Sequence, residues 1–101
     1  KGRQQRVLCR EIRFVQALKD YVGIQVAARR FVVYSTMAGI EQRLPHDQFL
    51  RVHRSYIVRV GSIKAIEDYQ VVLEDGEERI PIGGLYMAKV RERLQLDGAL
   101  T

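Results

Sequence analysis

Cationic and hydrogen-bonding side chains gather in one short stretch of the sequence, residues 49–60 and the few residues that follow. Between residues 51 and 64 there are basic side chains and no carboxylate, namely Arg51, His53, Arg54, Arg59 and Lys64. The apolar residues between them can hold the segment against a core, so the cations would be presented from a rigid support. Arginine and lysine presented in this way bind the phosphates and the base edges of nucleic acids. The alternative, that these are ordinary solvated positions beside a buried strand, stays open.

Catalysis and metal binding find little support among the same side chains. His53 and Ser55 would share a face of an extended chain, but a nucleophile and its base also need a third group that orients them. Two histidines seven residues apart and the single Cys9 do not form a metal-ligand pattern. No glycine-rich phosphate-binding motif is present. The sequence therefore predicts a binding module that is not an enzyme and that uses neither a metal nor another cofactor.

The length and composition predict one soluble globular domain. The chain has 101 residues, of which 47% are hydrophobic and 29% charged. Its apolar runs are too short to cross a bilayer and no signal peptide opens it, so we expect no membrane insertion. A single cysteine excludes an internal disulfide and fits a cytoplasmic protein. We expect residues 1–5 to be a flexible lead-in from a missing N-terminal domain, residues 6–97 to form the domain, and residues 98–101 to be a tail.

The positive charge is unevenly distributed along the chain. The net charge is +5, and residues 51–64 contain basic side chains only, whereas residues 65–80 contain six acidic residues and one basic residue. A protein with a cationic side and an anionic end becomes oriented in the field of a polyanion. Nucleic acid is therefore the first candidate partner, and an anionic membrane surface is the second.

Hydrophobic periodicity predicts strands joined by short, hairpin-like connections. We expect strands at residues 7–15, with a break near Arg10, and at residues 21–26, 31–34, 68–74 and 77–82. Residues 17–20 would connect the first two strands, and Asp75-Gly76 is the strongest turn signal. Helices are expected at residues 35–44, ended by Pro45, and at residues 85–96. The predicted fold is mainly β, with antiparallel strands in small sheets, one short internal helix and a C-terminal helix.

The segment Phe49-x-Arg51-Val52-His53-Arg54-Ser55-Tyr56-Ile57-Val58 resembles the signature of the LytTR family of DNA-binding domains. Weaker similarity upstream and downstream extends the resemblance over about residues 6–94. The resemblance implies an effector domain of a bacterial response regulator, one that inserts loops into successive major grooves of double-stranded DNA. It also implies binding as a dimer on direct repeats, and an N-terminal receiver or sensor domain that belongs to a two-component system of transcription regulation.

The resemblance also implies which residues contact DNA. Arg54 would contact base edges, together with Lys19 or Tyr21 from the loop after the first strand, although Tyr21 could equally be a core residue. Four further residues are expected either to contact DNA phosphates or to orient the Arg54 side chain. They are Arg51, His53, Ser55 and Arg59. The chain departs from the family pattern at Arg59, where Asn is frequent, and at Gly83-Gly84, where Ser and Arg are common.

Two other binding functions remain open on the sequence. The glycine loop would permit a protein-interaction or dimerisation module that has a LytTR-like fold without specific DNA recognition. A small RNA-binding β domain is also conceivable, although no stacking aromatics on an exposed sheet face are obvious in the sequence.

Overall fold

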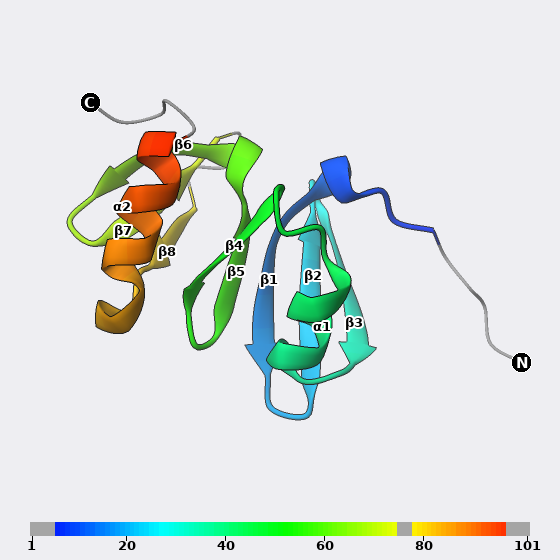
Figure 1. Cartoon of the computed structure of the whole chain (residues 1–101). Coiled ribbons are helices and arrows are strands. Elements are labelled where there is room, and N and C mark those ends of the chain that lie inside the picture. The colour runs from blue at the N-terminus through cyan, green and yellow to red at the C-terminus, as the bar shows by residue number, and fades with distance from the viewer. Residues whose placement is uncertain (1–5, 75–77, 97–101) are drawn as a thin grey trace, which may run out of the picture.

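A five-stranded antiparallel sheet with the strand order β3-β2-β1-β5-β4 forms the centre of the domain (Figure 1). The computed structural model describes residues 6–74 and 78–96. The five strands are β1 (Ile12–Leu18), β2 (Tyr21–Val26), β3 (Arg29–Tyr34), β4 (Phe49–His53) and β5 (Tyr56–Arg59). Every neighbouring pair in this sheet is antiparallel, as the short connections predicted.

A second, three-stranded sheet and the helices complete the fold. The sheet has the order β6-β7-β8, and its strands are β6 (Ile63–Glu67), β7 (Gln70–Leu73) and β8 (Arg79–Pro81). The helices are α1 (Met37–Arg43) and α2 (Met87–Leu96), with single 3-10 turns at η1 (Cys9–Glu11), η2 (Val60–Ser62) and η3 (Gly84–Tyr86). No helix in the part of the chain that the structure describes is long and apolar enough to span a membrane.

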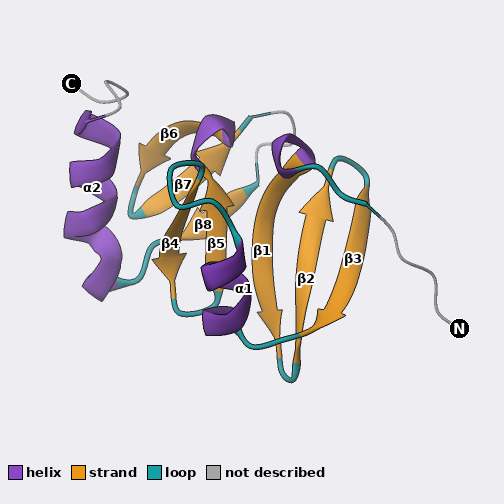
Figure 2. Cartoon of the chain, turned by 45° about the vertical axis from the view of Figure 1, so that its right-hand side comes forward, coloured by secondary structure: helices purple, strands orange, loops and turns teal. Residues whose placement is uncertain are grey.

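The five-stranded sheet carries a hydrophobic core on each face, because successive side chains of a strand point to opposite sides. Helix α1 covers one face, where the buried residues include Ile12, Val15, Val22, Ile40 and Ile57. The second sheet and α2 cover the other face, where the buried residues include Phe14, Val52, Val58, Leu73, Val90 and Leu94. Figure 2 shows α1 against the sheet near β5 and β1, and α2 at the opposite end of the domain. Both short helices therefore hold the sheet in place through side-chain burial.

The two helices form where the sequence predicts them, with slightly shorter bounds. Thr36 is the N-cap of α1, and its Oγ1 accepts a hydrogen bond of 2.9 Å from the Gly39 N–H. Met37, Ile40 and Leu44 are buried at helical spacing. In α2, Val90 and Leu94 form an apolar stripe, and both side chains are almost completely buried.

Two local predictions near the N-terminus are wrong. Residues 17 and 18 were expected in a connection, but they extend β1, because Ala17 pairs with Val22 and Leu18 with Tyr21. Only Lys19-Asp20 remain as the turn. The predicted break near Arg10 is confirmed, because residues 9–11 form a 3-10 turn, which is stabilised by a hydrogen bond of 3.2 Å from the Leu8 N–H to Glu11 Oε1. The strand predicted before this break is wrong, because residues 7 and 8 lie outside any strand.

An arginine of the large sheet joins it to the small one. Arg13 is buried, and its Nη2 lies 2.6 Å from the backbone oxygen of Glu74 and 2.6 Å from Glu78 Oε1. The hydrogen bond from Arg13 lowers the pKa of the Glu78 carboxyl below its usual range, although partial burial acts in the opposite direction. The predicted acidic hairpin end is therefore partly engaged in the fold, while the Asp75-Gly76 turn lies outside the described residues.

The Arg13–Glu78 ion pair makes part of the stability depend on pH. Because the pKa of Glu78 is lowered on folding, its contribution is present above the ordinary glutamate pKa of about 4.3 and is lost as the pH falls through the lowered value. We expect Glu78→Gln to reduce the free energy of unfolding at pH 7, and we expect this difference from the wild type to shrink as the pH falls through the lowered pKa, as measured by urea denaturation.

Glu67→Gln is the matched control for this prediction, since Glu67 pairs with Arg79 within the small sheet at 3.0 Å and both side chains are about half exposed. Its effect at pH 7 should be smaller, because exposed ion pairs contribute little. Equal effects of the two substitutions at pH 7 and at acidic pH would show that the Arg13 contact contributes nothing special.

Candidate nucleic-acid interface

The turns that follow β1 and β4 lie side by side at one end of the large sheet (Figure 1). Strands β1 and β5 are antiparallel neighbours, with Gln16 opposite Tyr56, so the C-terminal end of β1 lies beside the N-terminal end of β5. The Ala17 N–H donates a hydrogen bond of 2.9 Å to the Ser55 oxygen. This pairing brings Lys19-Asp20 next to Arg54-Ser55, although the two turns are distant in sequence.

The glycine loop before α2 joins these turns at the same end. The Gly83 N–H donates a hydrogen bond of 2.9 Å to the Val52 oxygen at the edge of β4. A Cβ atom at Gly83 would lie 3.1 Å from Tyr86 Cδ2, which is tight, and 3.6 Å from His53 Cδ2, which is ordinary van der Waals contact. Gly84 has open space around it, and Leu85 is 98% exposed. We call the β1–β2 turn, the β4–β5 turn and residues 83–86 together the turn end.

The β4–β5 turn was not predicted as a turn, because Arg54-Ser55 contains no glycine, proline or asparagine. The Arg51 side chain stabilises this turn through hydrogen bonds to its backbone oxygens. Its Nε donates to the His53 oxygen at 2.8 Å, its Nη2 to the Arg54 oxygen at 2.6 Å, and its Nη1 to Glu41 Oε1 of α1 at 2.6 Å. The Arg51 side chain is only 18% exposed. It is therefore placed to orient the turn rather than to meet a phosphate.

His53 and Ser55 also shape this turn. The Ser55 N–H donates a hydrogen bond of 3.0 Å to His53 Nδ1, so this nitrogen acts as an acceptor. The His53 ring also packs edge-to-face on the Tyr56 ring at a centroid distance of 5.6 Å. Arg54 lies at the exposed tip, and its guanidinium has no hydrogen-bond or ion-pair partner among the residues that the structure describes.

The second predicted contact region is also at the turn end. Lys19 is exposed and adopts the left-handed backbone conformation, with φ of 57°. Tyr21 is 46% exposed, so its interpretation as a core tyrosine is wrong. Its ring packs edge-to-face on Tyr34 at 5.4 Å, and Tyr34 is still more exposed. The structure thus brings Lys19, Tyr21 and Arg54 to one end of the sheet.

Arg59 is the predicted residue that the structure keeps apart. It lies at the far end of β5, five residues from Arg54, which corresponds to roughly 16 Å of extended strand. Its Nε donates a hydrogen bond of 2.7 Å to the Ile12 oxygen. Arg59 therefore cannot orient Arg54, and its guanidinium contributes to the local structure between β5 and β1.

The sequence analysis did not identify two residues that contact the turn end or lie at it, Glu41 and Tyr34. Glu41 had no recognisable signal, because its partner Arg51 lies in another element and only the fold brings the two together. Tyr34 could have been found, because alternation along β3 places Val33 on the core side and Val32 and Tyr34 on the outer face.

A profile of the LytTr DNA-binding domain family matches residues 2–95. The chain belongs to the LytTr DNA-binding domain family. The resemblance seen in residues 49–58 is thus confirmed, and so is the mainly β fold with two small sheets and a C-terminal helix. Among solved structures, the "LytTr DNA-binding domain of putative methyl-accepting/DNA response regulator from Bacillus cereus" has a TM-score of 0.74 at 28% identity. The match covers 84% of this chain and 82% of that chain.

Longer proteins contain a segment similar in sequence to this chain. The sensory transduction protein LytT of Bacillus subtilis is 30% identical over 81 residues, which are 75% of this chain and 33% of that protein. The CO-responsive transcriptional regulator RcoM of Rhodospirillum rubrum is 37% identical over 88 residues, which are 82% of this chain and 37% of that protein. The chain therefore spans only about a third of the length of these curated relatives.

The contacts around His53 make a prediction about the free LytTr domain. His53→Ala removes the acceptor of the Ser55 N–H, so we expect the Ser55 amide to exchange with solvent about 2- to 10-fold faster. That range follows from the roughly 0.5–1.5 kcal/mol that a single hydrogen bond contributes. Hydrogen exchange followed by NMR measures this rate.

His46→Ala is the control substitution, because the exposed His46 ring makes no hydrogen bond to any described residue. It should leave the Ser55 exchange rate unchanged. An unchanged rate in His53→Ala as well would mean that Arg51 alone fixes the turn.

Proposed function

We propose that this LytTr domain binds double-stranded DNA in a sequence-specific manner through its turn end, with Arg54 contacting base edges in a major groove. The observation that carries this proposal is the exposed guanidinium of Arg54, which has no partner among the described residues and lies at the tip of a turn whose backbone is held by Arg51 and His53. A guanidinium held on a fixed backbone loses little conformational freedom on binding. Arginine is also the side chain that most often binds guanine through two hydrogen bonds.

The neighbouring side chains take supporting roles in this proposal. Lys19 and Tyr21 lie on the adjacent turn and strand, so they reach the same stretch of duplex, Lys19 toward a phosphate and Tyr21 with its ring and hydroxyl. We assign Ser55, which follows Arg54 in the same turn, to a contact with the DNA backbone. Arg51 and His53 act by positioning. Arg51 Nε donates to the His53 oxygen, and His53 Nδ1 accepts from the Ser55 N–H, so both side chains stabilise the turn itself.

We further propose that the domain is the effector part of a cytoplasmic bacterial response regulator, joined to an N-terminal receiver or sensor domain. This rests on relatives about three times as long as the chain, among them a sensory transduction protein and a transcriptional regulator. Two copies on a direct-repeat operator are the expected assembly, and the duplex would meet loops rather than a helix.

One observation favours the alternative function of a protein-interaction or dimerisation module. The outer face of β3, an edge strand, exposes Val32 to 58% and Tyr34 to 77%. Exposed apolar side chains on an open edge can pair with another chain. This surface does not involve Arg54, so the two functions are separable by mutation.

The base contact assigned to Arg54 predicts a loss of specificity in Arg54→Ala. A duplex enriched from a random pool should bind about 5- to 150-fold more weakly, which corresponds to about 1–3 kcal/mol for a bidentate contact. Binding to an unrelated duplex should weaken far less. Affinities for both duplexes, measured at several salt concentrations, give the ratio.

Lys64→Ala removes the same charge from β6, away from the turn end, and is the matched control. It should leave the ratio of specific to non-specific affinity unchanged. Specific binding that survives Arg54→Ala intact would favour the protein-interaction alternative. A steep salt dependence without any enriched sequence would indicate a non-specific polyanion binder.

The ion pair from α1 predicts that Glu41 acts as a positioning residue for DNA recognition. Glu41→Gln weakens the hold on Arg51, so we expect the ratio of specific to non-specific affinity to fall about 3- to 10-fold. The circular dichroism spectrum and the salt slope should stay unchanged, because Glu41 does not touch the duplex in this proposal.

Glu92→Gln is the matched control for Glu41→Gln, since it removes an equal charge from α2, and Glu92 makes no ion pair among the described residues. Both variants should gain slightly in non-specific affinity through the lost negative charge. A specificity ratio that falls equally in both would contradict positioning through Arg51.

A further inference from the structure

A hollow of about 810 Å³ lies at the end of the large sheet that is opposite to the turn end. It is formed by η1, the β2–β3 turn at residues 27–28 and the last residue of β5, which lie away from the β1–β2 turn (Figure 1). Five arginines are among its lining residues, namely Arg6, Arg10, Arg13, Arg29 and Arg59. We call this concave surface the arginine hollow.

Arg59 is half-buried in the arginine hollow and uses only part of its guanidinium. Its Nε donates a hydrogen bond of 2.7 Å to the Ile12 oxygen. Its two terminal nitrogens have no hydrogen-bond or ion-pair partner among the described residues. A guanidinium that is partly removed from water without a carboxylate loses hydration that no described residue replaces. An anion in the hollow would supply the missing acceptors.

Gly61 provides the space in which the Arg59 guanidinium lies. A Cβ atom at residue 61 would lie 2.7 Å from Arg59 Nη1, which is too close for an ordinary contact. The guanidinium therefore occupies the volume that a side chain at residue 61 would fill. Any larger residue there would displace it without changing a charge.

The rim of the arginine hollow adds two exposed cations. Arg10 in η1 and Arg29 at the start of β3 are both exposed, and neither guanidinium has a hydrogen-bond or ion-pair partner among the residues that the structure describes. The Arg29 guanidinium lies over the Phe31 ring, 4.9 Å from its centroid. This contact orients the group and leaves its N–H donors available.

The charge of the arginine hollow stays positive when its internal contacts are taken into account. Arg13 is bound to the Glu78 carboxylate at 2.6 Å. Glu11 is the one carboxylate among the described lining residues, and its Oε1 accepts a hydrogen bond of 3.2 Å from the Leu8 N–H. Four arginines then stand against one glutamate, which leaves three positive charges. A small ligand with several negative charges matches this balance.

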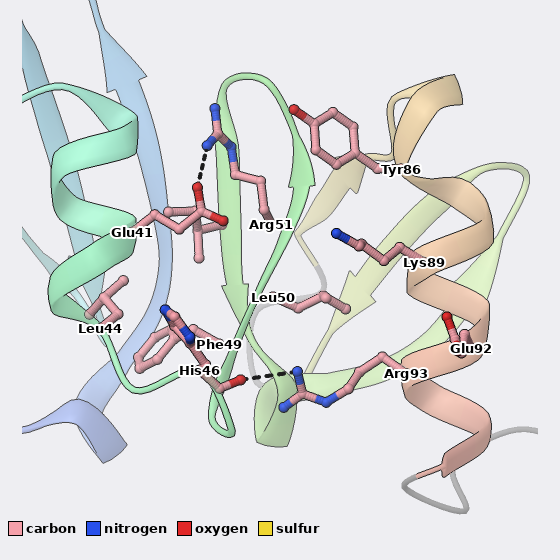
Figure 3. Close-up of a pocket in the computed structure, with 11 residues that line it drawn as sticks. Glu41, Leu44, His46, Phe49, Leu50, Arg51, Tyr86, Lys89, Glu92 and Arg93 are labelled. Carbon is pink, nitrogen blue, oxygen red and sulfur yellow. Dashed lines mark hydrogen bonds and ion pairs between the residues drawn. The ribbon is translucent and has the colours of Figure 1, made fainter.

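The groove between α1 and α2 has the opposite arrangement (Figure 3). There Arg51 binds Glu41 at 2.6 Å, and Arg93 donates to the His46 oxygen at 3.1 Å, so both guanidinium groups have acceptors within the chain. Two carboxylates line that groove, Glu41 and Glu92. Arginines in excess of their acceptors are therefore a property of the arginine hollow and not of this groove.

We propose that the arginine hollow binds an oligophosphate, either as a free anion or as the phosphate chain of a nucleotide. Guanidinium groups bind phosphate oxygens through pairs of parallel hydrogen bonds, and a chain of two or three phosphates carries enough charge to neutralise the hollow. The volume of about 810 Å³ lies in the range of small-molecule sites. The site does not include Arg54, so it is independent of the proposed DNA contact.

The test titrates inorganic tripolyphosphate into the 101-residue chain and follows the NMR spectrum at constant ionic strength. We expect saturable shifts of the Arg59 and Arg29 Nε resonances and of the Ala28 amide, with smaller shifts at Arg54. Inorganic monophosphate should bind at least about tenfold more weakly, because it reaches fewer guanidinium groups. The proposal is wrong if millimolar tripolyphosphate gives no saturable shifts, or if the shifts are largest at Arg54.

Two variants separate the charge of Arg59 from its position. Arg59→Met removes the guanidinium and should weaken tripolyphosphate binding about tenfold, the size of one charge-assisted hydrogen bond. Gly61→Ala keeps every charge but displaces the guanidinium, so we expect a loss of about 3- to 10-fold. The matched controls are Arg91→Met on α2 and Gly84→Ala, whose Cβ would meet no atom within 4 Å. Both controls should bind as the wild type does.

Wild-type affinity in Arg59→Met would overturn the proposal. Equal losses in Arg59→Met and Arg91→Met would overturn it as well, because they would indicate a general effect of net charge. If Arg59→Met fails to fold, Gly61→Ala and the rim variant Arg29→Met decide in its place, and each should lose affinity. The spectra are recorded without DNA, so a failure of the proposed function would leave this result unaffected.

ATP in place of tripolyphosphate distinguishes the two sources of the ligand. Tighter binding of ATP, with additional shifts at the apolar lining residues Val7 and Val26, would identify a nucleotide as the ligand. Tighter binding of tripolyphosphate would identify the free anion. If neither ATP nor tripolyphosphate binds more tightly than sulfate at equal ionic strength, the arginine hollow is not an oligophosphate site.

Discussion

The guanidinium of Arg51 is the constraint on which the turn end depends. It sits between a strand, a turn and a helix, and its planar fork satisfies two backbone oxygens and one carboxylate at once. A lysine could not do this, because a single ammonium cannot offer donors in three fixed directions in one plane. Without the guanidinium, the oxygens of His53 and Arg54 would have to find water, and the turn would lose its single conformation. The position of the exposed Arg54 at the tip therefore depends on the half-buried Arg51, which fixes the backbone of the turn.

Arg13 plays a similar part on the other side of the large sheet. It too is held by a backbone oxygen and a carboxylate, and it fixes the small sheet against β1. The apolar clusters bring the layers together but are not directional, whereas these arginines specify how neighbouring elements meet. Each lies at the border of a core, where its stem is covered and its head finds acceptors. The sheet is thus joined on one face to α1 and on the other to the hairpin of β7 and β8.

The sequence predicted elements whose information is local. Hydrophobic periodicity predicted α2 and β2, and Pro45 predicted the end of α1. It failed where pairing partners decide the structure: Leu18 stays in a strand because Tyr21 faces it, and Arg54-Ser55 turn without any typical turn residue. At the turn end, the motif predicted a set of contact residues, but it did not predict that Arg51 and His53 would form their hydrogen bonds within the turn. Contacts such as that between Glu41 and Arg51 follow from tertiary structure and have no signature in one sequence.

Arg51 binds the main chain of the turn and leaves the side chain at position 54 untouched. The conformation of the turn is consequently independent of which residue stands at its tip. Under the proposed function, a new side chain at position 54 would be carried by the same turn backbone, so one substitution would alter the preferred DNA sequence without damaging the fold. Separating the supporting residue from the contacting residue would then let related domains diverge toward different DNA sites through few substitutions.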